Sequence, residues 1–157
     1  KHMVWMLNRI LSAMVYTHDL GIVHCNIEPS HIMIKPDDHN VCILDWSYAA
    51  FRPSQTGDSF KVFTSIYSPS EVKEKRPPLP SSDFYSIGKV MIWLLGGDPE
   101  TNYIPEKVEK KLRQFLLWFV EESPLQRPQD ARKLHAQLIY TIESLWGTRR
   151  FLKFEMD

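Results

Sequence analysis

Several features that define whole classes of proteins are scarce in this chain of 157 residues. Its two cysteines, Cys25 and Cys42, are too few for a disulfide framework or a cysteine metal site, and two reduced thiols predict a cytoplasmic protein. The longest apolar runs, such as residues 115–120, are far shorter than the roughly 20 residues of a membrane span. Lys and Arg together number 19, as do Asp and Glu, and this balance argues against nucleic-acid binding.

What remains is the composition of one globular domain. Apolar residues make up 43% of the chain and charged residues 24%, which is typical of a folded protein. We expect a single domain over residues 4–157, and we interpret Lys1-His2-Met3 as a candidate remnant of cloning. No stretch at the start combines basic residues, an apolar run and a small-residue cleavage site, so no signal peptide is predicted.

Hydrophobic periodicity predicts a mainly helical fold with one small β-hairpin. Two short apolar runs joined by Pro36-Asp-Asp-His-Asn40 predict the hairpin over residues 32–44. Residues 47–80 are rich in proline and look irregular, and a loop of this length is usually functional. The apolar spacing predicts helices over residues 4–19, 84–95, 106–122 and 128–146, with Ser81–Asp83 as N-cap residues of the second.

Five elements, in order, resemble the protein kinase family. Residues 16–34 resemble its catalytic-loop region, which reads aromatic-x-His-x-x-Gly-Ile-Val-His-Arg-Asp-x-Lys-Pro. Residues 45–47 look like its Asp-Phe-Gly motif and residues 67–71 like the end of its activation segment. Residues 82–88 resemble the start of its large buried helix, and residues 124–128 its later Arg-Pro element. The resemblance implies the helical C-terminal lobe: a bundle around a buried central helix, with a small hairpin and a long loop like an activation segment.

The parts of a kinase that cover ATP have no counterpart in this sequence. No Gly-x-Gly-x-x-Gly occurs among its six glycines, and no strand with a phosphate-binding Lys precedes the first predicted helix. In kinases these parts belong to the N-terminal lobe and hold the phosphates of ATP. We therefore expect that the N-terminal lobe is absent.

Three positions of the catalytic loop depart from the family pattern. Asn26 matches the Asp that accepts the proton of the attacking hydroxyl, and an amide cannot accept that proton at pH 7. Glu28 matches a Lys beside the transferred phosphate, which reverses the charge; at about 4 Å and an effective dielectric constant of about 20 the repulsion is on the order of 4 kcal/mol. His31 matches an Asn that binds Mg²⁺, a cation that prefers oxygen ligands.

Other positions keep the residue types of the family. Asp45 matches the Mg²⁺-binding Asp and is interpreted either as a weak metal or nucleotide ligand or as a carboxylate with only local hydrogen bonds. Met33 matches the residue beneath the adenine ring, as a vestige of the nucleotide site. A transition-metal pair of His31 with Asp45 is a weaker hypothesis, since two ligands lack a third. Five residues match structural positions of the lobe: His24 and Trp46 in its stacked hydrophobic spine, Asp83 at the start of its central helix, and Glu71 with Arg127 in its buried ion pair.

A kept scaffold with altered chemistry predicts a pseudokinase, that is, a protein that is not an enzyme. The expected function is a protein-binding or regulatory module without cofactor, whose partner is a kinase or a second copy of the chain, with no nucleic acid and no membrane involved. The alternative is a C-lobe fragment of a divergent kinase that binds ATP and Mg²⁺ and phosphorylates Ser or Thr when its N-lobe is present. We interpret four helical tryptophans as core or packing aromatics: Trp5, Trp93, Trp118 and Trp146. We interpret four basic residues as a solvated helix face: Lys107, Lys110, Lys111 and Arg113.

Overall fold

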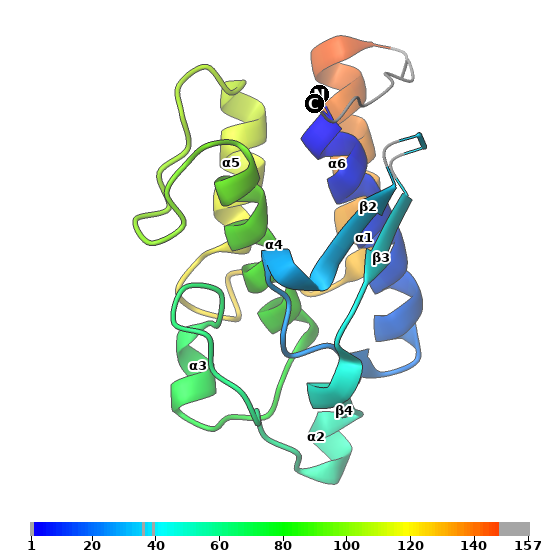
Figure 1. Ribbon diagram of the computed structural model, residues 1–157, viewed down its shortest axis with the longest axis vertical. Coiled ribbons are helices and arrows are strands. Elements are labelled where there is room, and N and C mark those ends of the chain that lie inside the picture. The colour runs from blue at the N-terminus through cyan, green and yellow to red at the C-terminus, as the bar shows by residue number, and fades with distance from the viewer. Residues whose placement is uncertain (1, 36, 39, 148–157) are drawn as a thin grey trace.

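The computed structural model describes residues 2–35, 37–38 and 40–147, and within them the fold is mainly helical, as the sequence predicts (Figure 1). Long helices surround a central one, and short strands and turns lie along one side. The helices are α1 (His2–Asp19), α2 (Pro53–Thr56), α3 (Ser70–Lys73), α4 (Pro80–Leu94), α5 (Lys110–Phe119) and α6 (Ala131–Trp146). The strands are β1 (Ile22–Val23), β2 (Ile32–Lys35), β3 (Asn40–Ile43) and β4 (Ala50–Phe51). Two single turns of 3₁₀ helix cover Pro29–His31 and Trp46–Tyr48.

The helix α4 forms the centre of the core because it is apolar on almost every side. Phe84, Ile87 and Met91 are fully buried, and even its polar residues Ser82 and Asp83 are almost completely shielded from solvent. Gly88 lets α5 approach closely, since a Cβ at that position would lie 2.7 Å from the Cβ of Phe119. The helices α1 and α6 pack side by side, and α1 contacts the central helix α4 (Figure 1).

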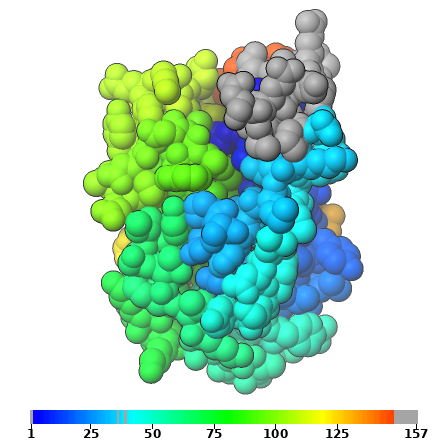
Figure 2. Space-filling view, viewed as in Figure 1, coloured from blue at the N-terminus to red at the C-terminus, as the bar shows by residue number. Residues whose placement is uncertain are grey.

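The predicted hairpin is formed by β2 and β3, which pair antiparallel with Ile32 opposite Ile43 and Lys35 opposite Asn40. One face of the hairpin packs on α1 and the other is open. Figure 2 is drawn from the same side and shows this region, coloured from blue to cyan, at the surface in the middle of the molecule.

Helix boundaries differ from the predicted ones for identifiable reasons. The helix α4 begins at Pro80, so Ser81–Asp83 lie in its first turn instead of capping it, and Ser82 at the third position accepts a hydrogen bond from the Leu79 N–H at 3.3 Å. The helix α5 begins at Lys110, because residues 106–108 form a turn before it. The helix α6 begins after Asp130, whose carboxylate accepts the Lys133 N–H at 2.9 Å.

Residues 47–80 are more structured than the sequence predicts. This stretch contains β4 and the short helices α2 and α3, and β4 pairs with β1 through Ile22 opposite Phe51 and Val23 opposite Ala50. Strands of two residues carry no periodic signal, so sequence alone could not reveal this pairing. The pairing matters because it ties the start of the long loop to the segment that carries His24 to His31.

Throughout the described part of the chain, no helix is both long and apolar enough to cross a bilayer.

Candidate functional site

Asp83, in the first turn of the buried helix α4, fixes the backbone of the segment that resembles a catalytic loop. Its carboxylate accepts the N–H groups of His24 at 2.8 Å and Cys25 at 2.9 Å, and it lies 2.9 Å from His18 Nε2. All three contacts join residues more than 50 positions apart in the chain, and Asp83 is 1% exposed. The loop is therefore anchored on the core and not held only by its own turns.

The anchored backbone adopts a conformation that ordinary side chains disfavour. Cys25 has φ 67° and Asp45 has φ 56°, in the left-handed region. Each such residue costs on the order of 1 kcal/mol or more, and such strain persists where the surrounding structure imposes it. Asp83 holds the backbone before Cys25, and the Asn26 N–H, which donates to His24 Nδ1, holds it after Cys25. The strain at Cys25 is therefore located at the candidate site.

Four polar side chains come together at the open end of the hairpin. Asn26 Nδ2 donates to Asp45 Oδ2 at 3.0 Å, and His31 Nε2 lies 3.5 Å from the same oxygen. His31 Nε2 also lies 3.7 Å from Glu28 Oε1, and Ser30 donates its hydroxyl hydrogen bond to Glu28. The His31 ring is oriented by its Nδ1, which is 2.7 Å from the Asn26 carbonyl oxygen. The three positions that depart from the kinase pattern thus form one cluster with Asp45.

The carboxyl group of Asp45 stays ionised over a wide pH range. A hydrogen bond from the Ser47 hydroxyl is the largest cause that holds its pKa below the ordinary value, and His31 and Asn26 act in the same direction. Asp45 is exposed, and its charge is available to a ligand. The cluster therefore presents an ionised carboxylate on the open face.

In contrast to the ionised Asp45 carboxylate, the side chains of His24 and Cys25 are buried and uncharged. Burial lowers the pKa of His24, whose Nε2 donates to the Leu44 carbonyl at 2.9 Å while its Nδ1 accepts the Asn26 N–H at 3.2 Å. These two contacts require one tautomer of a neutral imidazole, with its proton on Nε2. Burial, followed by the charge of Asp83, raises the pKa of the Cys25 thiol well above its usual range.

The side chains of the cluster are better suited to a metal ion that binds together with a phosphate ligand than to a metal ion held by the protein alone. Among the residues that the structure describes, no three His, Cys, Asp or Glu side chains are placed to hold a metal ion, so the pair of His31 and Asp45 gains no third ligand. Mg²⁺ in phosphate-transferring sites is bound through one or two carboxylates together with substrate phosphates. Asp45 offers one such carboxylate.

Beside the cluster lies an apolar surface. The rings of His24 and Trp46 meet edge to face, with centroids 4.4 Å apart, and the Trp46 indole N–H donates to the Ile43 carbonyl at 2.8 Å. Met33 on the hairpin is 60% exposed, and Trp46 is 37% exposed. The position matched to the adenine contact thus faces solvent.

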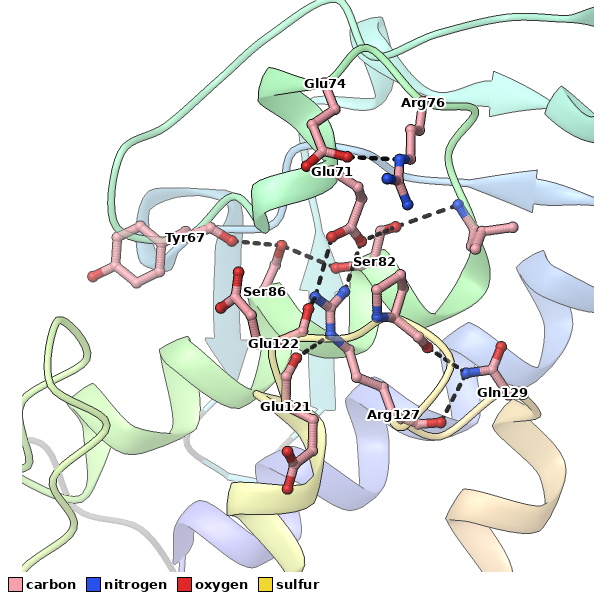
Figure 3. Close-up of polar contacts among 12 residues, drawn as sticks. Tyr67, Glu71, Glu74, Arg76, Ser82, Ser86, Glu121, Glu122, Arg127 and Gln129 are labelled. Atoms are coloured by element: carbon pink, nitrogen blue, oxygen red, sulfur yellow. Dashed lines mark hydrogen bonds and ion pairs between the residues drawn. The ribbon is translucent and has the colours of Figure 1, made fainter.

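A second buried network ties the long loop to the rest of the lobe (Figure 3). Arg127 binds Glu71 in bidentate fashion, with nitrogen to oxygen distances of 2.6 and 3.1 Å, and both side chains are at most 3% exposed. The Ser82 hydroxyl donates to Glu71 at 2.9 Å, and Arg127 also donates to the carbonyls of Glu121 and Glu122. The structure therefore brings together the two residues that the sequence assigned to one ion pair.

Sequence reasoning missed several residues that support these networks. His18 belongs to the anchor on Asp83, and Ser82 and Ser86 complete the network around Glu71, with Ser86 donating to the Tyr67 carbonyl at 2.8 Å. The signal for His18 was its place in the family pattern, two residues after the aromatic position. Ser82 was interpreted as a cap because small polar residues at the start of a helix usually have that role, and Ser86, within the apolar helix, carried no signal.

Comparison with known proteins gives a family match and several relatives. The model of the protein kinase domain matches residues 1–149. The chain is 32% identical over 96 residues to the serine/threonine-protein kinase dkf-1 of Caenorhabditis elegans, covering 59% of this chain and 13% of the relative. It is 31% identical over 96 residues to a probable casein kinase II subunit alpha homolog of Encephalitozoon cuniculi, a match that covers 60% of this chain and 30% of the relative. It is 30% identical over 114 residues to sperm motility kinase 2B of Mus musculus, a match that covers 71% of this chain and 22% of the relative. The chain thus spans less than a third of the length of each of these relatives.

These relatives correct one expectation. The sequence predicted a protein that is not an enzyme, because Asn26, Glu28 and His31 replace catalytic residue types. The relatives are named as protein kinases, among them a serine/threonine-protein kinase, which points to an enzyme, so that prediction is wrong. That prediction rested on three side chains, whereas the similarity to these relatives extends over 96 residues or more.

The fold and the family match agree over almost all of the described residues. A buried central helix carries Asp83 beneath the catalytic-loop segment, and the Glu71–Arg127 pair joins the long loop to the helices. The match to the kinase domain extends over residues 1–149, and the helical architecture is that of its C-terminal lobe. The chain belongs to the protein kinase family.

Proposed function

We propose that this chain is the lower lobe of a phosphotransferase that moves the γ-phosphoryl group of ATP to a Ser or Thr hydroxyl when an upper lobe covers it. The observation that carries the proposal is the meeting of Asp45, Asn26 and His31 at the open end of the hairpin, on a backbone anchored by Asp83. Phosphoryl transfer needs mostly positioning and neutralisation of charge, and little covalent participation by the protein. A backbone that is still anchored by Asp83 can meet the need for positioning even though the side chains of the loop differ from the family pattern.

In this proposal each side chain has a defined task. Asp45 would hold the Mg²⁺ that accompanies ATP, whose chemistry in such a site is to neutralise the phosphate charge. Asn26, held by Asp45 at 3.0 Å, orients the acceptor hydroxyl. The hydroxyl oxygen forms a bond to the γ-phosphorus, the bond between that phosphorus and the oxygen of ADP breaks, and the hydroxyl proton passes to the Glu28 carboxylate. Glu28 has this role because Asn26 cannot accept a proton and Asp45 is engaged by the metal.

The upper lobe is the partner that this surface requires. Met33 and Trp46 expose apolar area beside the cluster, and exposed apolar patches commonly mark sites that another protein part covers. A lobe placed over Met33 would close the nucleotide between the two parts and exclude water. In this proposal the regulatory role expected from the sequence is control of phosphate transfer by the lobe that covers Met33.

The test is phosphate transfer by the longest natural chain that carries this sequence. With labelled ATP and Mg²⁺, Asp45→Asn should lower transfer to Ser/Thr peptides on the order of 100-fold or more, because it removes the carboxylate that faces the phosphates. Glu28→Gln should lower the rate with little change in the apparent affinity for ATP.

Asp38→Asn is the matched control. Asp38 is another carboxylate whose pKa is lowered by local hydrogen bonds, those of Asn40, but it lies at the hairpin turn away from the cluster. The Asp38 variant should transfer phosphate at the unmodified rate. A wild-type chain that transfers no faster than Asp45→Asn would overturn the proposed function.

A further inference from the structure

A groove runs between α5 and α6, on elements that contribute nothing to the cluster around Asp45. It encloses about 390 Å³, and its walls include Phe115 and Trp118 from α5 and Tyr140 and Thr141 from α6. The two helices run in opposite directions, so the beginning of α5 and the end of α6 lie at the same end of the molecule (Figure 1). The groove therefore follows the last turns of α6.

The walls of the groove expose aromatic surface, including Trp118, which the sequence had assigned to packing. Trp118 is 40% exposed and Tyr140 is 69% exposed. Trp118 is also fixed in place, because its indole N–H donates to the Gln126 carbonyl at 2.8 Å. A fixed, half-open indole beside an open phenol ring forms a preorganised surface for an apolar side chain.

The groove also has a charge preference. Lys111 is the one charged residue in its lining. It is exposed, and α5 carries two further basic residues, Lys110 and Arg113, and no acidic residue. A segment that combines apolar side chains with carboxylates would complement both the aromatic walls and Lys111.

We propose that residues 151–157 of this chain, Phe-Leu-Lys-Phe-Glu-Met-Asp, bind in the groove between α5 and α6. Phe154 and Met156 alternate with Glu155 and Asp157 in this segment, which is the apolar and acidic combination that the groove favours. The lysine within it, Lys153, stands outside this alternating part.

The reach of the chain permits this binding. The helix α6 ends at Trp146, and Gly147 has φ 70°, a left-handed conformation that ends the helix and that glycine adopts without strain. From Ser144 back to Gln137, which both line the groove, is about 10 Å along the helix axis at roughly 1.5 Å per residue. Seven extended residues span up to about 23 Å at roughly 3.3 Å per residue. The segment is long enough to lie along the groove, and its tether raises its effective concentration there.

The experiment uses the full chain with a photoreactive side chain in the segment. The substitution Phe154→p-benzoylphenylalanine is introduced, the protein is irradiated, and linked peptides are mapped by mass spectrometry. The expected product is a link within one chain to peptides that contain residues 111–118 or 137–144. Lys111→Glu should reduce the yield of this link at least threefold, because it puts a negative charge in the groove.

Lys107→Glu is the matched control, since Lys107 is also exposed but does not line the groove, and it should leave the yield unchanged. Both lysines are on the surface, so neither variant should compromise folding. Links to another part of the chain, the absence of a link, or equal yields in both variants would overturn the proposal. A link between chains whose yield grows with protein concentration would also overturn it and would assign the groove to a second copy.

Discussion

Replacement of Glu71 by alanine is expected to lower the free energy of unfolding by about 3–5 kcal/mol, because it leaves the Arg127 charge buried without a partner. The two side chains are at most 3% exposed and share a bidentate contact, so water cannot take the place of the lost carboxylate. The Ser82 hydroxyl would lose its acceptor as well. Denaturant unfolding of the two proteins measures the difference.

The chain offers a matched control in Glu74, which lies three residues later on the same segment. Glu74 pairs with Arg76 at 2.6 Å, but these side chains are 51% and 62% exposed, so Glu74→Ala should change stability by less than about 1 kcal/mol. A double replacement, Glu71→Leu with Arg127→Met, should cost less than Glu71→Ala alone, since no unpaired charge remains. If Glu71→Ala proves no more harmful than Glu74→Ala, the pair does not hold the long loop in the way its geometry implies.

Asp83→Ala is expected to have an effect of similar size, and the damage should be concentrated in the catalytic-loop segment. The change leaves the N–H groups of His24 and Cys25 and the ring of His18 without their acceptor, and each buried donor left unpaired costs about 1–3 kcal/mol. Because these contacts also impose the left-handed conformation of Cys25, the backbone should relax once they are removed. Hydrogen exchange measured per peptide should accelerate most over residues 22–31 and least over α6.

Asp98→Ala provides the comparison for this second prediction. Asp98 also accepts a backbone N–H, that of Glu100 at 2.9 Å, and a hydroxyl, that of Thr101 at 2.8 Å, but it lies at the surface and is only partly buried. Water can replace the lost carboxylate there, so exchange over residues 22–31 should not change. Uniform acceleration across the whole chain in Asp83→Ala, with no excess in that segment, would mean that Asp83 stabilises the fold without positioning the loop.

The sequence predicted the long elements well because their signal is repeated along many residues. Three of the four predicted long helices lie close to their observed bounds, and the register of the hairpin follows from the alternation around its turn. The strands β1 and β4 were missed because two residues cannot show a period, and their pairing joins positions almost 30 residues apart. The exposure of Trp118 was missed for another reason: periodicity says which face of a helix is apolar but not whether a neighbour covers it.

The site was predictable only in part. The meeting of Glu71 with Arg127, and the place of Asp83 beneath the loop, followed from the resemblance and from no pattern of spacing, since 56 and 59 residues separate the partners. The sequence raised His31 beside Asp45 only as a weaker hypothesis, and it gave no sign of the contact of His31 with Glu28, because both contacts depend on a ring orientation set by the Asn26 carbonyl. That contact turns three separate departures from the family pattern into one connected group.

The unequal environments of the two cysteines provide a built-in reporter on this region. Cys42 is exposed on the hairpin, whereas Cys25 is buried between His24 and Asn26 with a thiol that resists ionisation. Only a thiolate reacts with alkylating reagents, so Cys42 should be modified at once and Cys25 only when the loop opens. The slow phase of native-state alkylation then gives the opening rate of the segment that carries Asn26, in the intact protein and without an added label.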